Sequence, residues 1–162
     1  MADNYLERKF EEHYSQSVAK RRPTKRIKVR RALVFGLPEP MAQAVSHSLR
    51  MLGHTVVVAD ALTESAQSDY DIFISSAEKA DECAAFLQKT DVNNCRKDRY
   101  SRFVVVGRNE DWESIKVKFT GLCETVNCIS FNQNTDCQNI AKACRIFISD
   151  ENSFINGNVL CI

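Results

Sequence analysis

The feature that most constrains the fold is a regular alternation of short apolar runs with helical stretches, which occupies most of the chain. The apolar run Ala32–Phe35 is followed by a turn and by a helical stretch at Pro40–Leu52. Gly53 ends that helix, because glycine readily adopts the left-handed conformation that follows a helix C-terminus. The β-branched run Thr55–Ala59 comes next and is typical of a strand buried in a parallel sheet. This order predicts a parallel sheet with helices on its faces.

The same alternation continues through the rest of the sequence. Four further strands are expected at Asp71–Ser75, Arg102–Val106, Val126–Ser130 and Asn158–Ile162, and three further helices at Ala80–Lys89, Asp111–Glu124 and Gln138–Ile148. A chain of 162 residues with 44% apolar content can bury one core but hardly two. We therefore predict a single Rossmann-like three-layer α/β/α domain over residues 31–162, with a mostly parallel sheet of about six strands.

Residues 1–30 form a charged leader that we expect to be partly helical or disordered. Leu6, Phe10 and Tyr14 recur at helical spacing within it. A helix of this length is marginal in water on its own, so we expect it to dock in an oligomer or to stay disordered. The basic stretch Lys20–Arg31 has no interleaved aromatic residues to stack on bases, which favours a solvated linker over a nucleic-acid site.

Charge and hydropathy exclude several classes of protein. The 22 Lys and Arg residues against 21 Asp and Glu residues leave a net charge of +1, so the whole chain offers no large field of one sign. No run reaches the roughly 18 apolar residues that a membrane span requires. The charged start MADNYLERKF lacks the apolar segment of a signal peptide. We expect a cytoplasmic protein that does not enter membranes.

The seven cysteines are odd in number and show no C-x-x-C pair or histidine partner at metal-ligand spacing. Several of them fall inside apolar runs. Free cysteine behaves as a small apolar residue and stays reduced in the cytoplasm. We therefore expect buried thiols and no metal site.

The turn after the first strand is the place where this kind of domain cradles the phosphates of a nucleotide. A dinucleotide turn uses three glycines, whereas residues 36–42 read GLPEPMA. Gly36 and the small Ala42 fit that pattern, but Pro40 removes a backbone donor and Glu39 adds a negative charge. Asp60 ends the second strand and could accept hydrogen bonds from a ribose, although an acidic residue there is more often a helix cap or solvated.

The most specific motif lies in residues 139–162, which read NIAKACRIFISDENSFINGNVLCI. This order of a helix, an S-D-x-x-x-F-I-x-G segment and a final strand resembles the end of a short-chain dehydrogenase/reductase. Residues 125–130, TVNCIS, resemble the sixth strand of that family, with Phe131 and Asn132 in place of its Pro-Gly. The resemblance covers most of residues 31–162. It implies a Rossmann fold, NAD(P) as cofactor and oxidoreductase chemistry.

The resemblance also implies a catalytic Tyr and Lys spaced Y-x-x-x-K, and residues 31–162, over which the resemblance extends, contain no such pair. Tyr70 and Tyr100 are followed four residues later by Ile and Val. The nearest match is Trp112 with Lys116, and an indole cannot exchange the proton that a reductase transfers. The family's serine falls near residues 107–109, which read Gly-Arg-Asn. We interpret Trp112 and Lys116 as a degenerate remnant and assign no catalytic residue.

A bound nucleotide would lie, by the same resemblance, against Gly36, Ala42 and Asp60, and against Ala77 in the SSAE segment that replaces an asparagine-rich sequence of the family. The family's third strand and its helix are absent or shrunken between residues 61 and 70, which leaves less protein surface to contact a nucleotide. We therefore expect no cofactor, with NAD(P) as the alternative.

Three functional interpretations follow. We favour a catalytically inactive relative of the family that associates with itself, as a dimer, or with a paralogous subunit. The resemblance places the contact surfaces at Ala80–Lys89, Asp111–Glu124 and Asn158–Ile162, the last of which ends in bare apolar residues. The alternative is an oxidoreductase or nucleotide sensor that binds NAD(P) at an atypical site. A minor alternative is polyanion binding by the basic leader.

Overall fold

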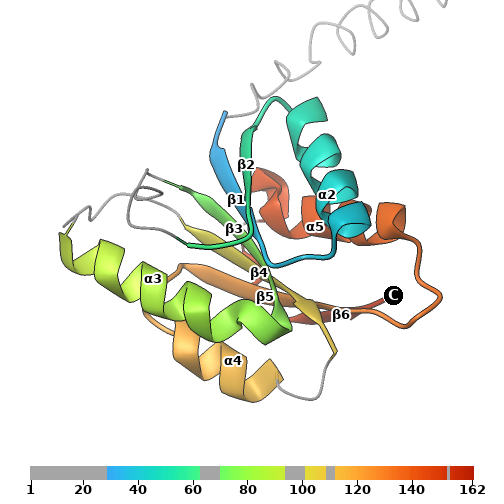
Figure 1. The fold of residues 1–162 in the computed structure, drawn as a ribbon. Helices are drawn as coiled ribbons and strands as arrows, with labels where there is room; N and C mark the ends of the chain where they lie inside the picture. The colour runs from blue at the N-terminus through green and yellow to red at the C-terminus, as the bar shows by residue number, and fades with distance from the viewer. Residues whose placement is uncertain (1–28, 63–69, 94–100, 109–111, 153) are drawn as a thin grey trace, which may run out of the picture.

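The computed structural model describes residues 29–62, 70–93, 101–108, 112–152 and 154–162, which form one sheet with helices on both faces (Figure 1). The six strands run in the spatial order β2-β1-β3-β4-β5-β6, and every neighbouring pair is parallel. Their bounds are β1 Arg31–Phe35, β2 Thr55–Ala59, β3 Ile72–Ser76, β4 Arg102–Gly107, β5 Thr125–Ser130 and β6 Val159–Cys161. The predicted Rossmann-like fold with a parallel sheet is confirmed.

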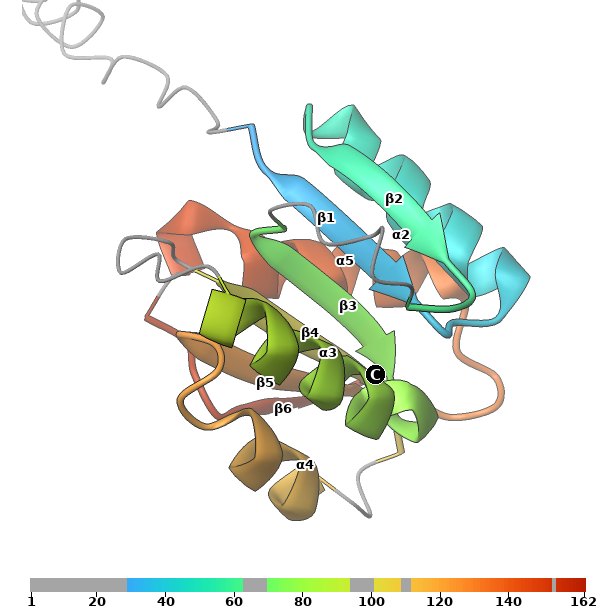
Figure 2. The same cartoon turned by 60° about the vertical axis from the view of Figure 1, so that its left-hand side comes forward.

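Four α-helices cover the sheet within the described residues. They are α2 Glu39–Met51, α3 Ala80–Asn93, α4 Trp112–Phe119 and α5 Cys137–Ile148, and short 3-10 turns follow β3 (η2, Ala77–Lys79) and α5 (η4, Asp150–Asn152). Helices α2 and α5 pack on one face of the sheet and against each other, whereas α3 and α4 cover the other face (Figure 2). None of these helices is long and apolar enough to cross a membrane.

The central strands are buried on both faces. All five residues of β3 and the first five of β4 are buried. Val34 and Ile74 face α2 and α5, whereas Phe103 faces α3 and α4 and stacks on Phe119 with ring centroids 3.8 Å apart. A parallel strand covered on both faces needs apolar residues at every position, which accounts for the unbroken apolar runs of the sequence.

The helix after β4 is shorter than the sequence analysis predicts. Asp111–Glu124 was expected to be helical, but α4 ends at Phe119 and position 111 lies outside the described residues. Gly121 has a φ of +85°, the left-handed conformation that terminates helices, so residues 120–124 form a turn before β5. Helix α3 differs in the other direction, because it continues past the predicted Lys89 to Asn93.

Both ends of the sheet are edge strands within the described residues. β2 pairs only with β1, and β6 pairs only with β5. The described parts of the segment between β2 and β3 contain no strand, in agreement with the predicted loss of the family's third strand, although residues 63–69 lie outside the description. The predictions for the leader fall almost entirely on residues 1–28, which also lie outside it.

Arg102 joins α5 to the sheet from a buried position that the sequence analysis did not single out. The residue begins β4, is 1% exposed, and donates a hydrogen bond from Nη1 to the carbonyl of Ile148, the last residue of α5. Carbonyls in the last turn of a helix lack intrahelical partners, and a cation is favourable beside them. Arg102 therefore fastens the carboxyl end of α5 over the amino end of β4.

We expect Arg102→Met to lower the free energy of unfolding by about 2–4 kcal/mol, because it leaves a buried carbonyl of α5 without this donor. Urea denaturation measures the change. Arg50→Met is the matched control, because Arg50 also donates to a backbone carbonyl, that of Val56 at 3.4 Å, but is exposed. We expect the control to cost less than about 0.5 kcal/mol. Equal losses in the two variants would contradict the role assigned to Arg102.

Candidate functional site

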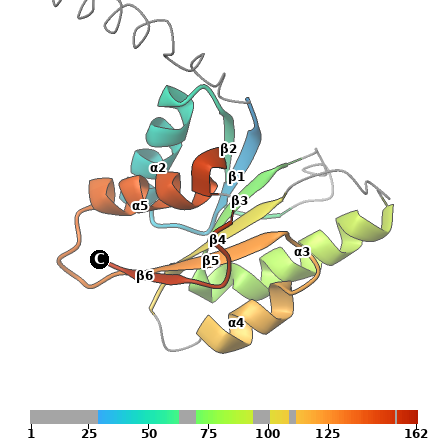
Figure 3. The same ribbon diagram turned by 180° about the vertical axis from the view of Figure 1, so that it is seen from behind.

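The strand order places the candidate site between the carboxyl ends of β1 and β3. From β1 the chain passes through α2 to β2 on one side, and from β3 it passes through α3 to β4 on the other side (Figure 3). In open α/β sheets, ligands bind at such a reversal of strand order, outside the carboxyl ends of the strands. The residues that follow β1 and β3 therefore decide what this edge can hold.

Gly36 makes the turn after β1 and lies directly against the turn after β3. Its φ of +66° is a left-handed conformation that suits glycine. A Cβ at this position would lie 2.5 Å from Cγ and 2.9 Å from Cβ of Lys79, and 3.1 Å from Oγ of Ser76. The glycine is thus used for close approach, but the group that approaches is the stem of a lysine of the same chain.

Lys79 is held in this place by packing more than by charge. It ends the 3-10 turn η2, and its Nζ lies 2.5 Å from Oε1 of Glu82 one turn further along. The two side chains are 42% and 52% exposed, and ion pairs of this kind contribute at most about 1 kcal/mol. The stem therefore closes the crevice between β1 and β3 while the ammonium group stays at the surface.

Ser76, the last residue of β3, brings a hydroxyl into the same place. Its Oγ is buried and has no hydrogen-bond partner among the described residues. The neighbouring Ser75 satisfies its own hydroxyl by donating to the Ser76 carbonyl at 3.0 Å. A buried hydroxyl without a partner costs about 1–3 kcal/mol, so Ser76 is the one polar group of this site that a ligand could satisfy.

The amino end of α2 is poor in donors for an anion. Pro38 is the N-cap residue and Pro40 is in the first turn, so neither offers an N–H group. The N–H of Ala42 is already bonded to the Pro38 carbonyl at 2.9 Å. Glu39 adds a carboxylate, which accepts a hydrogen bond from Gln43 at 3.0 Å. The pyrophosphate of an NAD(P) cofactor needs free amides and little negative charge, and the residues of this turn do not fit it.

Of the four predicted cofactor residues, Gly36, Asp60 and Ala77 lie along this edge. Asp60 follows β2 and is exposed beside Gly36, because Phe35 pairs with Ala59 in the sheet register. Ala77 occupies the gap between β3 and β4, since a Cβ added to Gly107 would lie 2.4 Å from the Cβ of Ala77. The fourth residue, Ala42, is instead buried in α2.

Trp112 and Lys116 do not join this site. Trp112 is 4% exposed and packs in the core between the sheet and helices α3 and α4. Lys116 lies against Gly157, because a Cβ added to Gly157 would be 3.2 Å from Nζ of Lys116. Gly157 donates its N–H to the carbonyl of Val126 at the start of β5, so Lys116 reaches toward the amino ends of the strands. The interpretation of this pair as a catalytic remnant stays a prediction.

The described residues hold no evident metal centre, and three of their thiols are buried. They contain no group of three or more His, Cys, Asp or Glu side chains that could hold a metal ion. Burial raises the pKa of the Cys144 thiol to about 12 and that of the Cys128 thiol to about 11. Burial also raises the pKa of Cys83. A thiol reacts as its thiolate, so these three side chains are inert at neutral pH.

Comparison with known proteins supports the fold and does not place the chain in a family. By sequence, the chain matches no family model and no curated protein. By structure, it is similar to a 3-alpha-hydroxysteroid dehydrogenase from Pseudomonas sp. B-0831 complexed with NADH, with 13% identity, a TM-score of 0.58, and coverage of 82% of this chain and 94% of that one. A short-chain dehydrogenase/reductase mutant from Serratia marcescens follows, with 14% identity, a TM-score of 0.56, and coverage of 85% and 97%.

A protein of another kind has a similar architecture. The inactive form of the regulatory domain from the repressor of iron transport regulator shares 18% identity, with a TM-score of 0.51 and coverage of 72% of this chain and 91% of that one. Identities this low show a shared fold and nothing finer. Short-chain dehydrogenases and a regulatory domain thus share this architecture, and the activity of the chain has to be argued from its own residues.

Lys79 and Ser76 are the residues of this edge that sequence reasoning missed. The segment SSAE at residues 75–78 was interpreted as a replacement for the family's asparagine-rich sequence, with only Ala77 placed against a nucleotide, and Lys79 was not considered. The contact of Ser76 and Lys79 with Gly36 depends on β1 and β3 being neighbours in the sheet. The available signal was the predicted Rossmann-like fold, because the usual strand order of that fold makes these two strands neighbours.

Gly36→Ala tests the contact with Lys79. We expect it to lower the free energy of unfolding by about 3 kcal/mol, of which about 1 kcal/mol is the left-handed backbone and the rest is overlap with the lysine stem. Gly53→Ala is the matched control, because Gly53 has a φ of +86° but nothing within 4 Å of a Cβ. We expect it to cost only about 1 kcal/mol.

Adding Lys79→Ala to Gly36→Ala should recover about 1–2 kcal/mol of that loss, because neighbouring substitutions couple through the space they share. Chemical denaturation of the four proteins of this double-mutant cycle measures the coupling. Strictly additive losses would show that the Lys79 stem does not occupy the space beside Gly36.

We also expect Cys161, which is exposed, to be alkylated by iodoacetamide at pH 8 well before Cys83, Cys128 and Cys144. The pKa of each of these three thiols is raised by burial, so each stays protonated at that pH, and reagent access is limited as well. Mass spectrometry of peptides over time gives the order. As a control, all four cysteines should be labelled at similar rates in denaturant. Labelling of Cys144 as fast as that of Cys161 in the native protein would contradict the prediction.

Proposed function

We propose that this chain is a non-catalytic α/β module whose function is association with another subunit, in the first instance a second copy of itself. The observation that carries the proposal is the contact of the Lys79 stem and Ser76 with Gly36, at the place where this fold would bind a nucleotide. A crevice closed by the chain's own side chains gives a cofactor no room beside the first turn.

The charged groups along the carboxyl edge also support a non-catalytic role. Glu39 is bonded to Gln43 within α2, and Lys79 is paired with Glu82. The phenol that reductase chemistry requires has no counterpart at this edge among the described residues, since Tyr70 lies before β3, at the amino ends of the strands. The tyrosine that serves a reductase of this kind as its general acid is therefore missing from the described part of the edge.

The proposal of association is supported by the two open edges of the sheet. Strands β2 and β6 each have one side without a strand partner among the described residues. Unpaired edge strands are ready templates for another chain, and natural monomers cover or charge them. A paralogous subunit could use the same edges, and a mixed assembly is the variant of this proposal that the resemblance in the sequence suggests.

One observation favours a second function, the binding of NAD(P) or another nucleotide. The buried hydroxyl of Ser76 has no partner among the described residues, and Asp60 is exposed beside Gly36. A ligand that displaced the Lys79 stem could use both groups. This alternative requires the crevice to open, which the first proposal does not.

NADH and NADPH at millimolar concentration should leave the melting temperature of the full chain unchanged. A ligand present at about 100 times its dissociation constant would add about 2.7 kcal/mol of stability, a shift of several degrees. Sedimentation velocity on the same samples should show a dimer, with or without nucleotide. A saturable rise in melting temperature would favour the nucleotide-binding alternative, and a monomer at every concentration would overturn the proposal of self-association.

A further inference from the structure

The outer side of β2 carries backbone groups that the sheet does not use. Thr55 donates its N–H to the carbonyl of Arg30 beside β1, and strand residues alternate in the direction of their backbone groups. The N–H and C=O groups of Val56 and Val58 therefore face away from β1. Arg50 donates to the Val56 carbonyl at 3.4 Å, and the backbone groups of Val58 have no partner among the described residues.

The strand itself lacks the residues that keep an edge strand from pairing, although the guanidinium of Arg50 from α2 lies on its Val56 carbonyl. The strand reads TVVVA, without a proline, a lysine or a bulge. The Val58 side chain is 46% exposed although it lies next to the apolar core. β-branched side chains that are neighbours across a strand pair stabilise it, so an edge of three valines favours a strand as its partner.

The two ends of this edge are opposite in charge. Arg50 lies at the end of α2, beside the amino end of β2, and its guanidinium bonds the Val56 carbonyl. Asp60 follows the carboxyl end of β2 and is exposed. A second β2 running antiparallel would bring the Asp60 of each strand toward the Arg50 of the other. A parallel partner would instead bring like charges together.

We propose that two copies of this chain pair through β2, antiparallel about a two-fold axis at Val57, to form one continuous sheet. In this register each Val56 lies opposite the Val58 of the other copy, and each such pair exchanges two backbone hydrogen bonds, with the Val58 N–H replacing Arg50 as the donor to the Val56 carbonyl. Val57 meets its own symmetry mate. The inference rests on the proposed self-association and names the surface through which it occurs.

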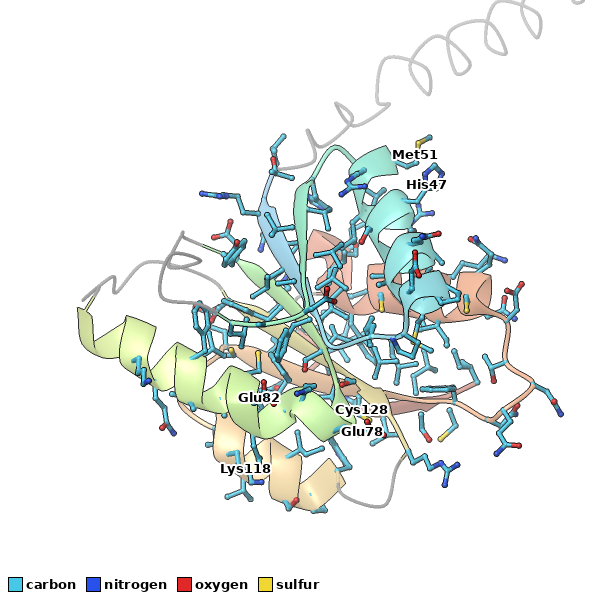
Figure 4. The ribbon with its side chains drawn as sticks, in the orientation of Figure 1. His47, Met51, Glu78, Glu82, Lys118 and Cys128 are labelled. Carbon is cyan, nitrogen blue, oxygen red and sulfur yellow. The ribbon has the colours of Figure 1, made fainter. Side chains whose placement is uncertain are left out.

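The other surfaces are less suited to a second copy. β6 has three residues against the five of β2, and residues 154–162, which include β6, contain no Asp, Glu, Lys or Arg that could set the direction of a partner. The outer surfaces of α3 and α4 carry several charged side chains, among them Lys118 on α4 (Figure 4). Lys118 bridges to Asp81 of α3 at 2.5 Å. Exposed apolar side chains on the helices, such as Val117, stand singly, as they commonly do on monomers.

Val58→Pro tests the proposal with little effect on the fold, because the N–H that it removes faces away from β1. Each dimer would lose two inter-chain hydrogen bonds, so we expect the dimer dissociation constant to rise at least about tenfold. Sedimentation velocity over a hundredfold range of protein concentration measures it. Val58→Lys, which places a charge on the edge without constraining the backbone, should have a similar effect.

Val117→Lys is the control, because it makes the same substitution at another exposed valine, on α4, and should leave the dissociation constant unchanged. A charge exchange tests the direction of pairing. Asp60→Arg alone and Arg50→Asp alone should each weaken the dimer, and the double variant should restore much of the affinity because the opposite charges meet again.

The outcomes separate this inference from the proposed function. Weakening by both Val58 variants, with recovery in the charge exchange, supports the β2 interface. A stable dimer that neither Val58 variant weakens would overturn the inference and leave the proposed self-association standing, with β6 or the leader as the interface. A wild-type chain that is monomeric at all concentrations would overturn both. Circular dichroism of each variant confirms that the fold is retained.

Discussion

The packing of the Lys79 stem against Gly36 determines what the carboxyl edge of the sheet can hold. These two residues follow β3 and β1, the strands between which the order of the sheet reverses. In related architectures this place is concave and receives a ligand, because neighbouring helices leave it in opposite directions. Here the left-handed turn at Gly36 admits a side chain of the same chain instead, and the prolines at the start of α2 remove the amides that an anion would need.

The described residues leave the buried hydroxyls of Ser76 and Thr125 without a partner on inner strands, and they leave open backbone groups at the two sides of the sheet. Hydrogen bonding within a parallel sheet leaves the outer backbone groups of its two edge strands open. β2 offers such groups between a basic and an acidic end, and its valines present little but apolar surface. The proposed assembly would use the architecture in which a structurally similar dehydrogenase was solved in complex with NADH, which agrees with the general independence of fold and function.

The strand and helix order could be predicted from the sequence because an unbroken apolar run is typical of a strand that is buried on both faces of a sheet. β4, for example, was expected at Arg102–Val106, and all five of those residues are buried. β2 was also expected at the residues it occupies, but it is an edge strand in which only Val56 is buried. The end of α4 was missed although Gly121 signals it, because the helical pattern was continued through a glycine that terminates it. Arg102 was missed for a different reason. Its partner is a carbonyl of α5 that is 46 residues away in the chain, and only the packing of α5 over β4 brings the two together.

The candidate site was partly predictable. Pro40 and Glu39 correctly indicated an α2 N-terminus with few donors and an added negative charge, because both effects are local. The role of Lys79 could not be predicted, since a lysine three residues after a strand is ordinarily a solvated residue. Its stem lies against Gly36 here because the turns after β1 and β3 meet, and that contact depends on sheet order and on a glycine without a side chain.

Nuclear Overhauser effects between the α-protons of Gly36 and the β- and γ-methylene protons of Lys79 test this account most directly, because they report the contact in solution. We predict strong cross-peaks that persist when NADH is added in large excess. Absent cross-peaks, together with saturable movement of the Gly36 and Ser76 amide signals on addition of NADH, would contradict it. That result would mean that the crevice is open and that the chain binds a nucleotide.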